Sequence, residues 1–293
     1  MSTAVWSTPL DHSGNAGFQA WYGELLAQLI AINAALFVQT ADTGQLGAGA
    51  ARPAINTAAG YWIFKFDDGH TILYFKIEPG TGTSANIPMG WLTVGTGTNG
   101  AGTLTGIITA RSTWAVGTAP VSAVTNYTSY LCVVAGAVSL GWKTLSRGVG
   151  TQSGGYFGVY RSVTDAGIYN NDGFVQYTSL TSTGQFAQSV NLSTGTIFSG
   201  NVAPGSANGT CLIPYGITSS VVGGNAQYFR HFAAYPLARP IVGVVSVIAA
   251  EYPVGTSFAG ESGSITDHTF VSLGLSMQQA SNLTASGIAF IWE

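Results

Sequence analysis

The chain has 293 residues, of which 46% are hydrophobic and only 7% are charged, with a formal net charge of −3. Disorder is not expected, because disordered chains combine low hydrophobicity with high charge. Nucleic-acid binding is not expected either, because no basic cluster could neutralise a row of phosphates. A surface solvated by hydroxyl and amide groups suits a protein that buries much of it against identical copies or neighbouring proteins.

The N-terminal part of the chain contains one convincing helix pattern, at residues 16–38. Its apolar side chains recur at spacings of four and three, as in a heptad seam, and Asn15 is a possible N-cap. Glu24 is the only charge, and a helix that is apolar or small nearly all round is buried. Two interpretations stay open: packing against the β-rich remainder of the same chain, or an oligomer seam between symmetry mates. The seam residues are Phe18, Tyr22, Leu25, Leu29, Ile32 and Leu36.

The same region bears on the cellular context. The first residues show no basic segment followed by an apolar core, so no secretory signal is expected. The most apolar stretch, residues 25–38, is too short to span a bilayer, and no membrane partner is predicted. Cys132 and Cys211 stand in apolar strand-like surroundings and are expected to be reduced core residues.

From Tyr61 onward the sequence changes to strand patterns. YWIFKF (61–66) and TILYFKI (71–77) flank Asp67-Asp68-Gly69-His70, which predicts a hairpin. WLTV and TLTGIITA complete four strands before residue 110. Further strand-like runs lie at 127–138, 156–161, 174–180, 210–213, 241–250, 270–275 and 287–292.

These patterns predict a mainly β fold. An N-terminal α-helix precedes two antiparallel β-sheet regions, sandwich-like or jelly-roll-like, that are intertwined in a homo-oligomer. The expected divisions are residues 1–45 for a helix that anchors or oligomerises, 46–110 for a small four-stranded region and 111–293 for a larger β domain.

Gly95, Gly97 and Gly100 have the G-x-G-x-x-G spacing of dinucleotide-binding turns. That fingerprint requires a helix directly after the glycines and an acidic residue about 20 residues later. Residues 103–109 instead alternate Thr with Leu or Ile, and no acidic residue follows at that distance. We therefore predict a hairpin loop and expect no cofactor.

Four features occur together in residues 37–106. They are Thr40-Ala41-Asp42-Thr43-Gly44-Gln45 after the helix, Arg52-Pro53, the aromatic strand starting at Tyr61, and the loop VGTGTNGAGTLTG. In these features the chain resembles virion structural proteins of tailed bacteriophages, which include tail, tail-fibre and baseplate components. The resemblance implies a multimeric part of the virion, made in the host bacterial cytoplasm, and it offers no catalytic residues to carry over.

Three patterns suggest chemistry but are interpreted otherwise. Asp67, Asp68 and His70 could ligate a metal, yet Asp and Gly are what a tight turn requires, and no second ligand cluster is visible. The stretch 170–173 (NNDG) is interpreted as a hairpin turn rather than a calcium loop. The stretch 260–264 (GESGS) lacks the last glycine of G-x-S-x-G, so no enzyme and no metal site are predicted.

Aromatic and amide-rich segments at 154–161 and 168–174 are the candidate receptor-contact loops. Aromatic faces beside Asn, Asp and Arg are suited to contacts with sugars or with another protein. The alternative is that these aromatic side chains pack in the core or between subunits. The candidate residues are Tyr156, Phe157, Tyr160, Tyr169, Asn170, Asn171 and Asp172.

The sequence thus predicts a non-enzymatic structural component of a tailed phage particle, associated with a tail fibre or the baseplate. The expected partners are the chain itself, with a trimer favoured, and other virion proteins. Two alternatives remain open: a module on the host-facing end of the tail that binds a bacterial surface glycan or protein, and a head decoration or head fibre protein.

Overall fold

The computed structural model describes residues 2–9, 14–82, 88–115, 126–144, 154–163, 169–181, 184–191, 196–201, 211–212, 228–233, 239–248, 257–262, 265–272 and 286–292. These residues form a mainly β fold with antiparallel sheets and one helix, α1 (Asn15–Ala31). The mainly β prediction with an N-terminal helix is confirmed.

Seven strands form the smaller sheet, in the order β2-β4-β5-β6-β7, with β3 paired to β5 and β8 paired to β6. Their bounds are β2 (Phe37–Gln39), β3 (Thr57–Ala58), β4 (Trp62–Phe66), β5 (Leu73–Thr81), β6 (Pro88–Thr98), β7 (Leu104–Ile107) and β8 (Ser112–Ala115). The predicted hairpin across residues 67–70 and the four predicted strands before residue 110 are confirmed as β4 to β7.

Thirteen strands form the larger sheet, whose main path is β1-β9-β10-β11-β17-β20-β19-β18. A branch through β12, β13 and β14 leaves β11, and a branch through β16 and β15 leaves β17. Their bounds are β1 (Thr3–Pro9), β9 (Asn126–Val134), β10 (Ala137–Thr144), β11 (Gly154–Val163), β12 (Tyr169–Thr181), β13 (Gly184–Asn191), β14 (Thr196–Asn201), β15 (Cys211–Leu212), β16 (Tyr228–Ala233), β17 (Arg239–Ile248), β18 (Ser257–Ser262), β19 (Ile265–Ser272) and β20 (Ser286–Ile291).

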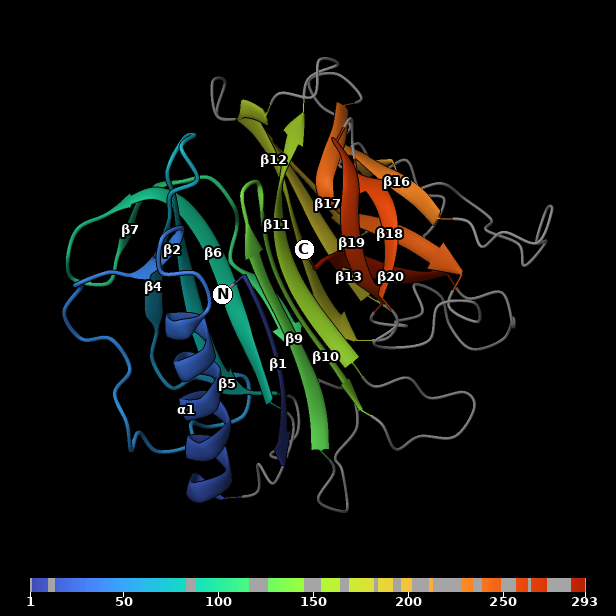
Figure 1. Ribbon diagram of the computed structural model, residues 1–293. Coiled ribbons are helices and arrows are strands. Elements are labelled where there is room, and N and C mark those ends of the chain that lie inside the picture. The colour runs from blue at the N-terminus through green and yellow to red at the C-terminus, as the bar shows by residue number, and fades with distance from the viewer. Residues whose placement is uncertain are drawn as a thin grey trace.

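The long strands β9 to β12 lie in the middle of the molecule (Figure 1). The helix and the seven-stranded sheet cover one face of these strands, and the C-terminal strands β16 to β20 lie on the other side. Leu131 and Val133 of β9 point into the core shared with the helix, whereas Tyr130 packs edge-on against Trp292 at the C-terminal end of the chain. Successive side chains of a strand point to opposite faces. β9 therefore places apolar side chains on both faces of the large sheet.

The helix packs against its own chain. All six predicted seam residues lie in the main core cluster or against it, and five of them are at most 1% exposed, so the oligomer-seam interpretation of this face is wrong for this fold. The alternative interpretation, packing on the chain's own sheets, is the arrangement found. The seam residues are Phe18, Tyr22, Leu25, Leu29 and Ile32, with Leu36 half-buried beside them.

The ends of the helix also differ from the prediction. Gly14 is the N-cap, and the Asn15 side chain instead accepts a hydrogen bond from the Arg52 N–H at 3.0 Å. The helix ends at Ala31 rather than near residue 38, because the Asn33 carbonyl closes a turn that leads into β2. The side-chain amide of Asn33 donates to the carbonyl of Val133 in β9 of the larger sheet. Within the described ranges, no helix has the length and apolar character needed to cross a membrane.

Three expectations for the strands and turns need correction. The single run predicted at 127–138 is a tight hairpin, because residues 135–136 form a turn in which Gly136 has a φ of +79°. The NNDG stretch at 170–173 is not a turn but part of β12. The seven residues of β1 were missed, as were β8, β13, β14, β16 and β18. In β1 the available signal was the β-branched and aromatic content of Thr3, Val5 and Trp6.

The expected divisions of the chain do not coincide with the sheets. The small sheet spans residues 37–115 and holds seven strands rather than four. The first strand, β1, belongs to the large sheet, where it pairs with β9 more than 100 residues later. The core cluster that contains α1 also includes residues of both sheets, so these parts fold around a common core.

Candidate functional site

The loop at residues 40–45 (TADTGQ) is fastened to the tip of the β6–β7 hairpin by Asp42. The Asp42 carboxylate accepts hydrogen bonds from the Thr40 hydroxyl (2.6 Å), the Thr98 hydroxyl and the Gly102 N–H (3.1 Å). Asp42 is only 7% exposed, so the hydrogen bonds replace the water that the carboxylate loses. We call these four residues the Asp42 network.

The ionisation of Asp42 reflects this environment. Burial on its own raises the pKa of a carboxyl group, because it disfavours the charged form. Hydrogen bonds from Thr40, Thr98 and Gly102 stabilise the carboxylate and outweigh burial, so the pKa of Asp42 lies below its ordinary value. Asp42 is therefore ionised at neutral pH and acts as an acceptor that fixes the loop, not as a proton donor.

The glycine-rich stretch forms a hairpin, as predicted. β6 continues through Gly95 and Gly97 and pairs with β7, so the stretch is not followed by the helix that a dinucleotide site requires. Gly102 has a φ of +84°, and a Cβ there would lie 2.0 Å from the Tyr61 hydroxyl oxygen. The glycine is needed for backbone conformation and for the close approach of Tyr61.

Two further side chains complete the connection between loop and hairpin. The Tyr61 hydroxyl donates to the Thr43 carbonyl, and the Lys76 ammonium donates to the Gly102 carbonyl at 2.9 Å. Lys76 also lies over the Tyr61 ring, 4.6 Å from its centre. Residues from the TADTGQ loop, the strands and the glycine hairpin are thus parts of one hydrogen-bonded unit.

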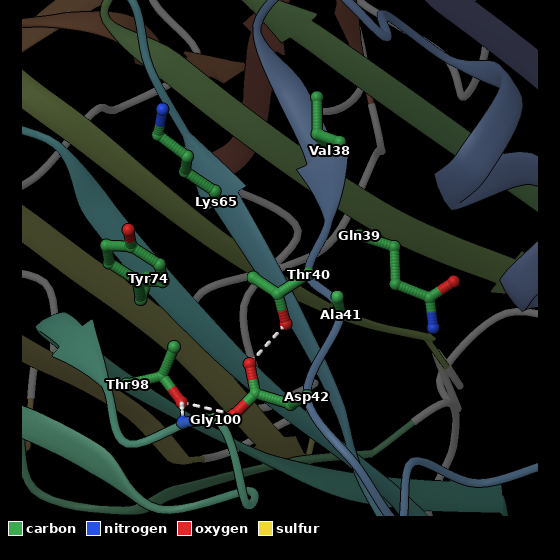
Figure 2. Close-up of a pocket in the computed structure, with 9 residues that line it drawn as sticks. All are labelled: Val38, Gln39, Thr40, Ala41, Asp42, Lys65, Tyr74, Thr98 and Gly100. Atoms are coloured by element: carbon green, nitrogen blue, oxygen red, sulfur yellow. Dashed lines mark hydrogen bonds between the residues drawn. The ribbon is translucent and has the colours of Figure 1, made fainter.

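A shallow depression of about 310 Å³ lies beside this unit (Figure 2). Its lining residues Val38, Lys65 and Tyr74 are neighbours along their strands of core residues, so the depression lies on the sheet face opposite the core. Its polar groups are largely engaged, since Asp42 accepts three hydrogen bonds and the Lys65 ammonium pairs with Asp67 at 2.7 Å. What it offers to a partner is a mixed surface of Tyr74, hydroxyl groups and an exposed valine. The lining residues are Val38, Gln39, Thr40, Ala41, Asp42, Lys65, Tyr74, Thr98 and Gly100.

A second polar centre joins the two sheets. Asp68 lies in the predicted β4–β5 turn, but its carboxylate accepts two hydrogen bonds of 2.8 Å from Arg161 of β11. The Gly136 N–H adds a third, and Arg161 also donates to the Thr71 carbonyl at 2.7 Å. The side chains of Asp68 and Arg161 are 0% and 1% exposed. We call this pair the Asp68–Arg161 clasp.

Sequence reasoning missed the clasp, because the DDG pattern is explained equally well by a turn. The turn is present, and Gly69 adopts a φ of +83° in it. One signal was available: few charges are found in the chain, and Arg161 lies within an apolar strand, where an arginine normally requires a partner. Its partner lies 93 residues away, and spacing along the sequence does not reveal such a distance.

The predicted receptor-contact residues do not form an exposed site. Tyr156, Phe157 and Tyr160 are at most 1% exposed, so their assignment as contact residues is wrong. Tyr160 accepts a hydrogen bond of 2.8 Å from the Ser139 hydroxyl, and burial raises the pKa of its phenol well above the ordinary value. These aromatics pack in the core, which was the alternative interpretation. The backbone of Tyr169, Asn170, Asn171 and Asp172 belongs to β12.

The remaining chemical patterns can be placed as well. Among the described residues no three His, Cys, Asp or Glu side chains are grouped so that they could hold a metal ion. Gly260 to Ser262 belong to β18, which forms a hairpin with β19 rather than the strand-to-helix turn of a nucleophile elbow; residues 263–264 lie outside the described residues. Cys132 is buried and forms no disulfide, as expected, and its thiol donates to the Trp292 carbonyl at 3.7 Å.

Comparison with protein-family models, with curated proteins and with solved structures gives no match to this chain. The geometry therefore has to be interpreted from its own contacts, which are the Asp42 network, the clasp and the open depression.

Proposed function

We propose that the chain is a non-enzymatic structural protein of a tailed phage particle, associated with a tail fibre or the baseplate and working as a homo-oligomer with a sandwich-like β body. One observation carries the proposal: the residues that resemble virion proteins serve as framework. Asp42, Tyr61 and Gly102 hold one another in place across 60 residues of sequence.

A framework role fits the demands on a particle component. Such a protein presents a fixed shape to its neighbours, and a rigid loop held by charge-assisted hydrogen bonds supplies one. The low content of charged residues points the same way, because surfaces that pack against other proteins are depleted in charge at their centres.

The test is to locate the protein in the particle. Virions purified from the phage or prophage that encodes the chain should contain its peptides by mass spectrometry, at several copies per particle. Labelling with an antibody against the chain should decorate the tail or baseplate in electron micrographs. Particles that lack the protein, or that assemble and infect normally when the gene is deleted, would contradict the proposal.

A second candidate function is binding of a glycan or receptor on the host surface. The observation that favours it is the depression of Figure 2, where Tyr74 and hydroxyl side chains are gathered beside Lys65. Aromatic and hydroxyl groups together suit a sugar ring. A glycan array probed with the wild-type chain and with Tyr74→Ala tests this function, with Ile107→Ala, an exposed residue elsewhere, as the control. Binding that is absent, or that Tyr74→Ala leaves unchanged, argues against it.

A further inference from the structure

Strand β1 lies at one end of the large sheet. It pairs with β9 in a continuous register from Thr3 to Pro9, without a bulge, and among the described residues no strand pairs with its other edge. In Figure 1 it is the dark blue strand between α1 and β9. A strand in this position presents a row of backbone N–H and C=O groups to a possible partner strand.

The register shows which groups face outward. The Val133 N–H donates to the Ser2 carbonyl at 2.8 Å, so Ser2 and Val133 are a hydrogen-bonded pair of the antiparallel ladder. Such pairs alternate with non-hydrogen-bonded pairs along the strand. Even-numbered residues of β1 therefore bond to β9, and the N–H and C=O groups of Thr3, Val5 and Ser7 point away from the sheet.

The last residue of β1 agrees with this alternation. Pro9 occupies an outward position, where its missing N–H costs the β1–β9 ladder nothing. Pro9 also limits how far an added strand could pair along β1, since it offers a carbonyl but no N–H. The outward edge that can both donate and accept is therefore the stretch from Thr3 to Ser7, with Val5 at its centre.

This edge lacks the devices that natural proteins use to prevent pairing. Residues 3–9 contain no charged side chain, and no bulge twists the edge away. Val5 is 54% exposed, although a β-branched residue is well suited to a cross-strand pair. An edge of this kind is suited to extension by another strand.

We propose that two copies of this chain associate by antiparallel pairing of their β1 strands around a two-fold axis at Val5. Val5 then exchanges both backbone hydrogen bonds with Val5 of the partner subunit, and Thr3 does so with Ser7 of the partner subunit. A shift by two residues in one direction would pair Thr3 with Pro9 of the partner subunit, which has no N–H to donate to the Thr3 carbonyl. The shift in the other direction would place Ser7 opposite residue 1, which lies outside the described residues. Centring on Val5 uses every outward N–H and C=O group from Thr3 to Ser7.

A second copy is the occupant that the composition favours. A two-fold axis at Val5 places Val5 opposite its own equivalent and Thr3 opposite Ser7 of the partner subunit, so a charge at the centre would face a like charge. The uncharged Thr3–Pro9 segment is complementary to itself without that penalty. The inference gives the proposed homo-oligomer a two-fold contact, and therefore a dimer in place of the trimer that the sequence favoured. It does not depend on a role in a virion.

The test is the mass of the purified full chain in solution. Analytical ultracentrifugation at tens of micromolar should show a dimer for the wild type. Val5→Lys places two like charges directly opposite each other and should shift the dissociation constant at least tenfold, to mainly monomer. Because Val5 is exposed, the fold should survive this change, which circular dichroism and the melting temperature would show. The matched control is Ile107→Lys, at a 59% exposed residue of the edge strand β7, which should remain dimeric.

Two further variants separate strand pairing from a general surface effect. A mixture of Val5→Lys and Val5→Glu chains should recover the dimer, since opposite charges then face each other. Ser7→Pro removes an outward N–H and should weaken the dimer without loss of β1–β9 pairing. A monomeric wild type, or a Val5→Lys chain that sediments as the wild type does, would overturn the inference. Either result would leave the particle role testable by its own experiment.

Discussion

Two aspartates in loops of the small sheet have different partners: Asp42 bonds to groups of its own sheet, and Asp68 bonds to groups of the large sheet. Asp42 is bound to residues of the same sheet and its hairpin, and it fixes the shape of an outer surface. Asp68 is bound to Arg161 and Gly136 and joins the small sheet to the central strands. The same residue type thus serves local shape in one case and the docking of two sheets in the other.

The contrast between the two aspartates shows at which site the removal of a charge should cost more folding stability. In the clasp both partners are buried, so removing either one leaves an uncompensated ion in an apolar environment. In the Asp42 network the donors are neutral. They are two hydroxyls, which can rotate toward water when the carboxylate is removed, and one backbone N–H, so no buried ion is left. Removing charge should therefore affect global stability at Asp68 and mainly local order at Asp42.

The largest effect is expected for Arg161→Met. It leaves the Asp68 carboxylate buried without its cation, and breaking a buried pair in this way costs about 3–5 kcal/mol. Urea unfolding followed by tryptophan fluorescence should show a much lower midpoint. A loss below about 1 kcal/mol would show that the clasp is open to water and would remove the contrast with Asp42.

A smaller effect is expected for Asp42→Ala. Hydrogen bonds to a charged group contribute about 1.5–3 kcal/mol, and here the loss should be concentrated in the loop and hairpin. Hydrogen exchange should show faster exchange at the Gly102 N–H, with little change in the central strands. Equal deprotection of β9 to β11 would show that Asp42 is coupled to the whole fold.

The next effect concerns the hairpin tip. Gly102→Ala should destabilise by about 1–2 kcal/mol from its left-handed backbone conformation, and the new Cβ should displace the Tyr61 hydroxyl as well. Gly100→Ala is the matched control, because Gly100 also has a positive φ but has open space around it. Thermal melts of the two variants should differ, and equal melting temperatures would show that the Tyr61 contact adds nothing.

A pH dependence follows from the lowered pKa of Asp42. The contribution of its ionised form is fully present above the ordinary pKa of 3.8 and is lost as the pH falls through the lower pKa of the folded state. The difference in unfolding free energy between wild type and Asp42→Asn should therefore be constant at higher pH and shrink in acid. A difference that grows below pH 3.8 would contradict the assigned direction.

The smallest effect is expected for Asp67→Asn, one residue before the clasp. Its ion pair with Lys65 is well exposed, and such pairs contribute little to stability. Its unfolding midpoint should match that of the wild type. A marked loss would mean that the adjacent turn, rather than the buried charge of Asp68, determines the effect of the larger variants.

The sequence by itself determined the mainly β class, the N-terminal helix and the β4–β5 and β6–β7 hairpins. The helix buries only one face, since Ile30 on the other is 47% exposed. The sequence also predicted the last strand, at 287–292 where the structure has β20 (Ser286–Ile291), and the hairpin to which Gly95, Gly97 and Gly100 belong. These features depend on local conformational preferences and on side-chain alternation over a few residues, and both can be read within a short window.

Only the tertiary structure decided which surfaces meet. It placed the helix seam on the chain's own sheets, paired β1 with β9, set β20 between β17 and β19, and buried Tyr156 and Tyr160. An apolar helix face can pack equally well against a symmetry mate or against its own sheet. An aspartate in a turn sequence does not reveal that it pairs with an arginine 93 residues away. Contacts of that kind are selected by the packing of the whole chain, because their energy depends on burial that only the assembled layers create.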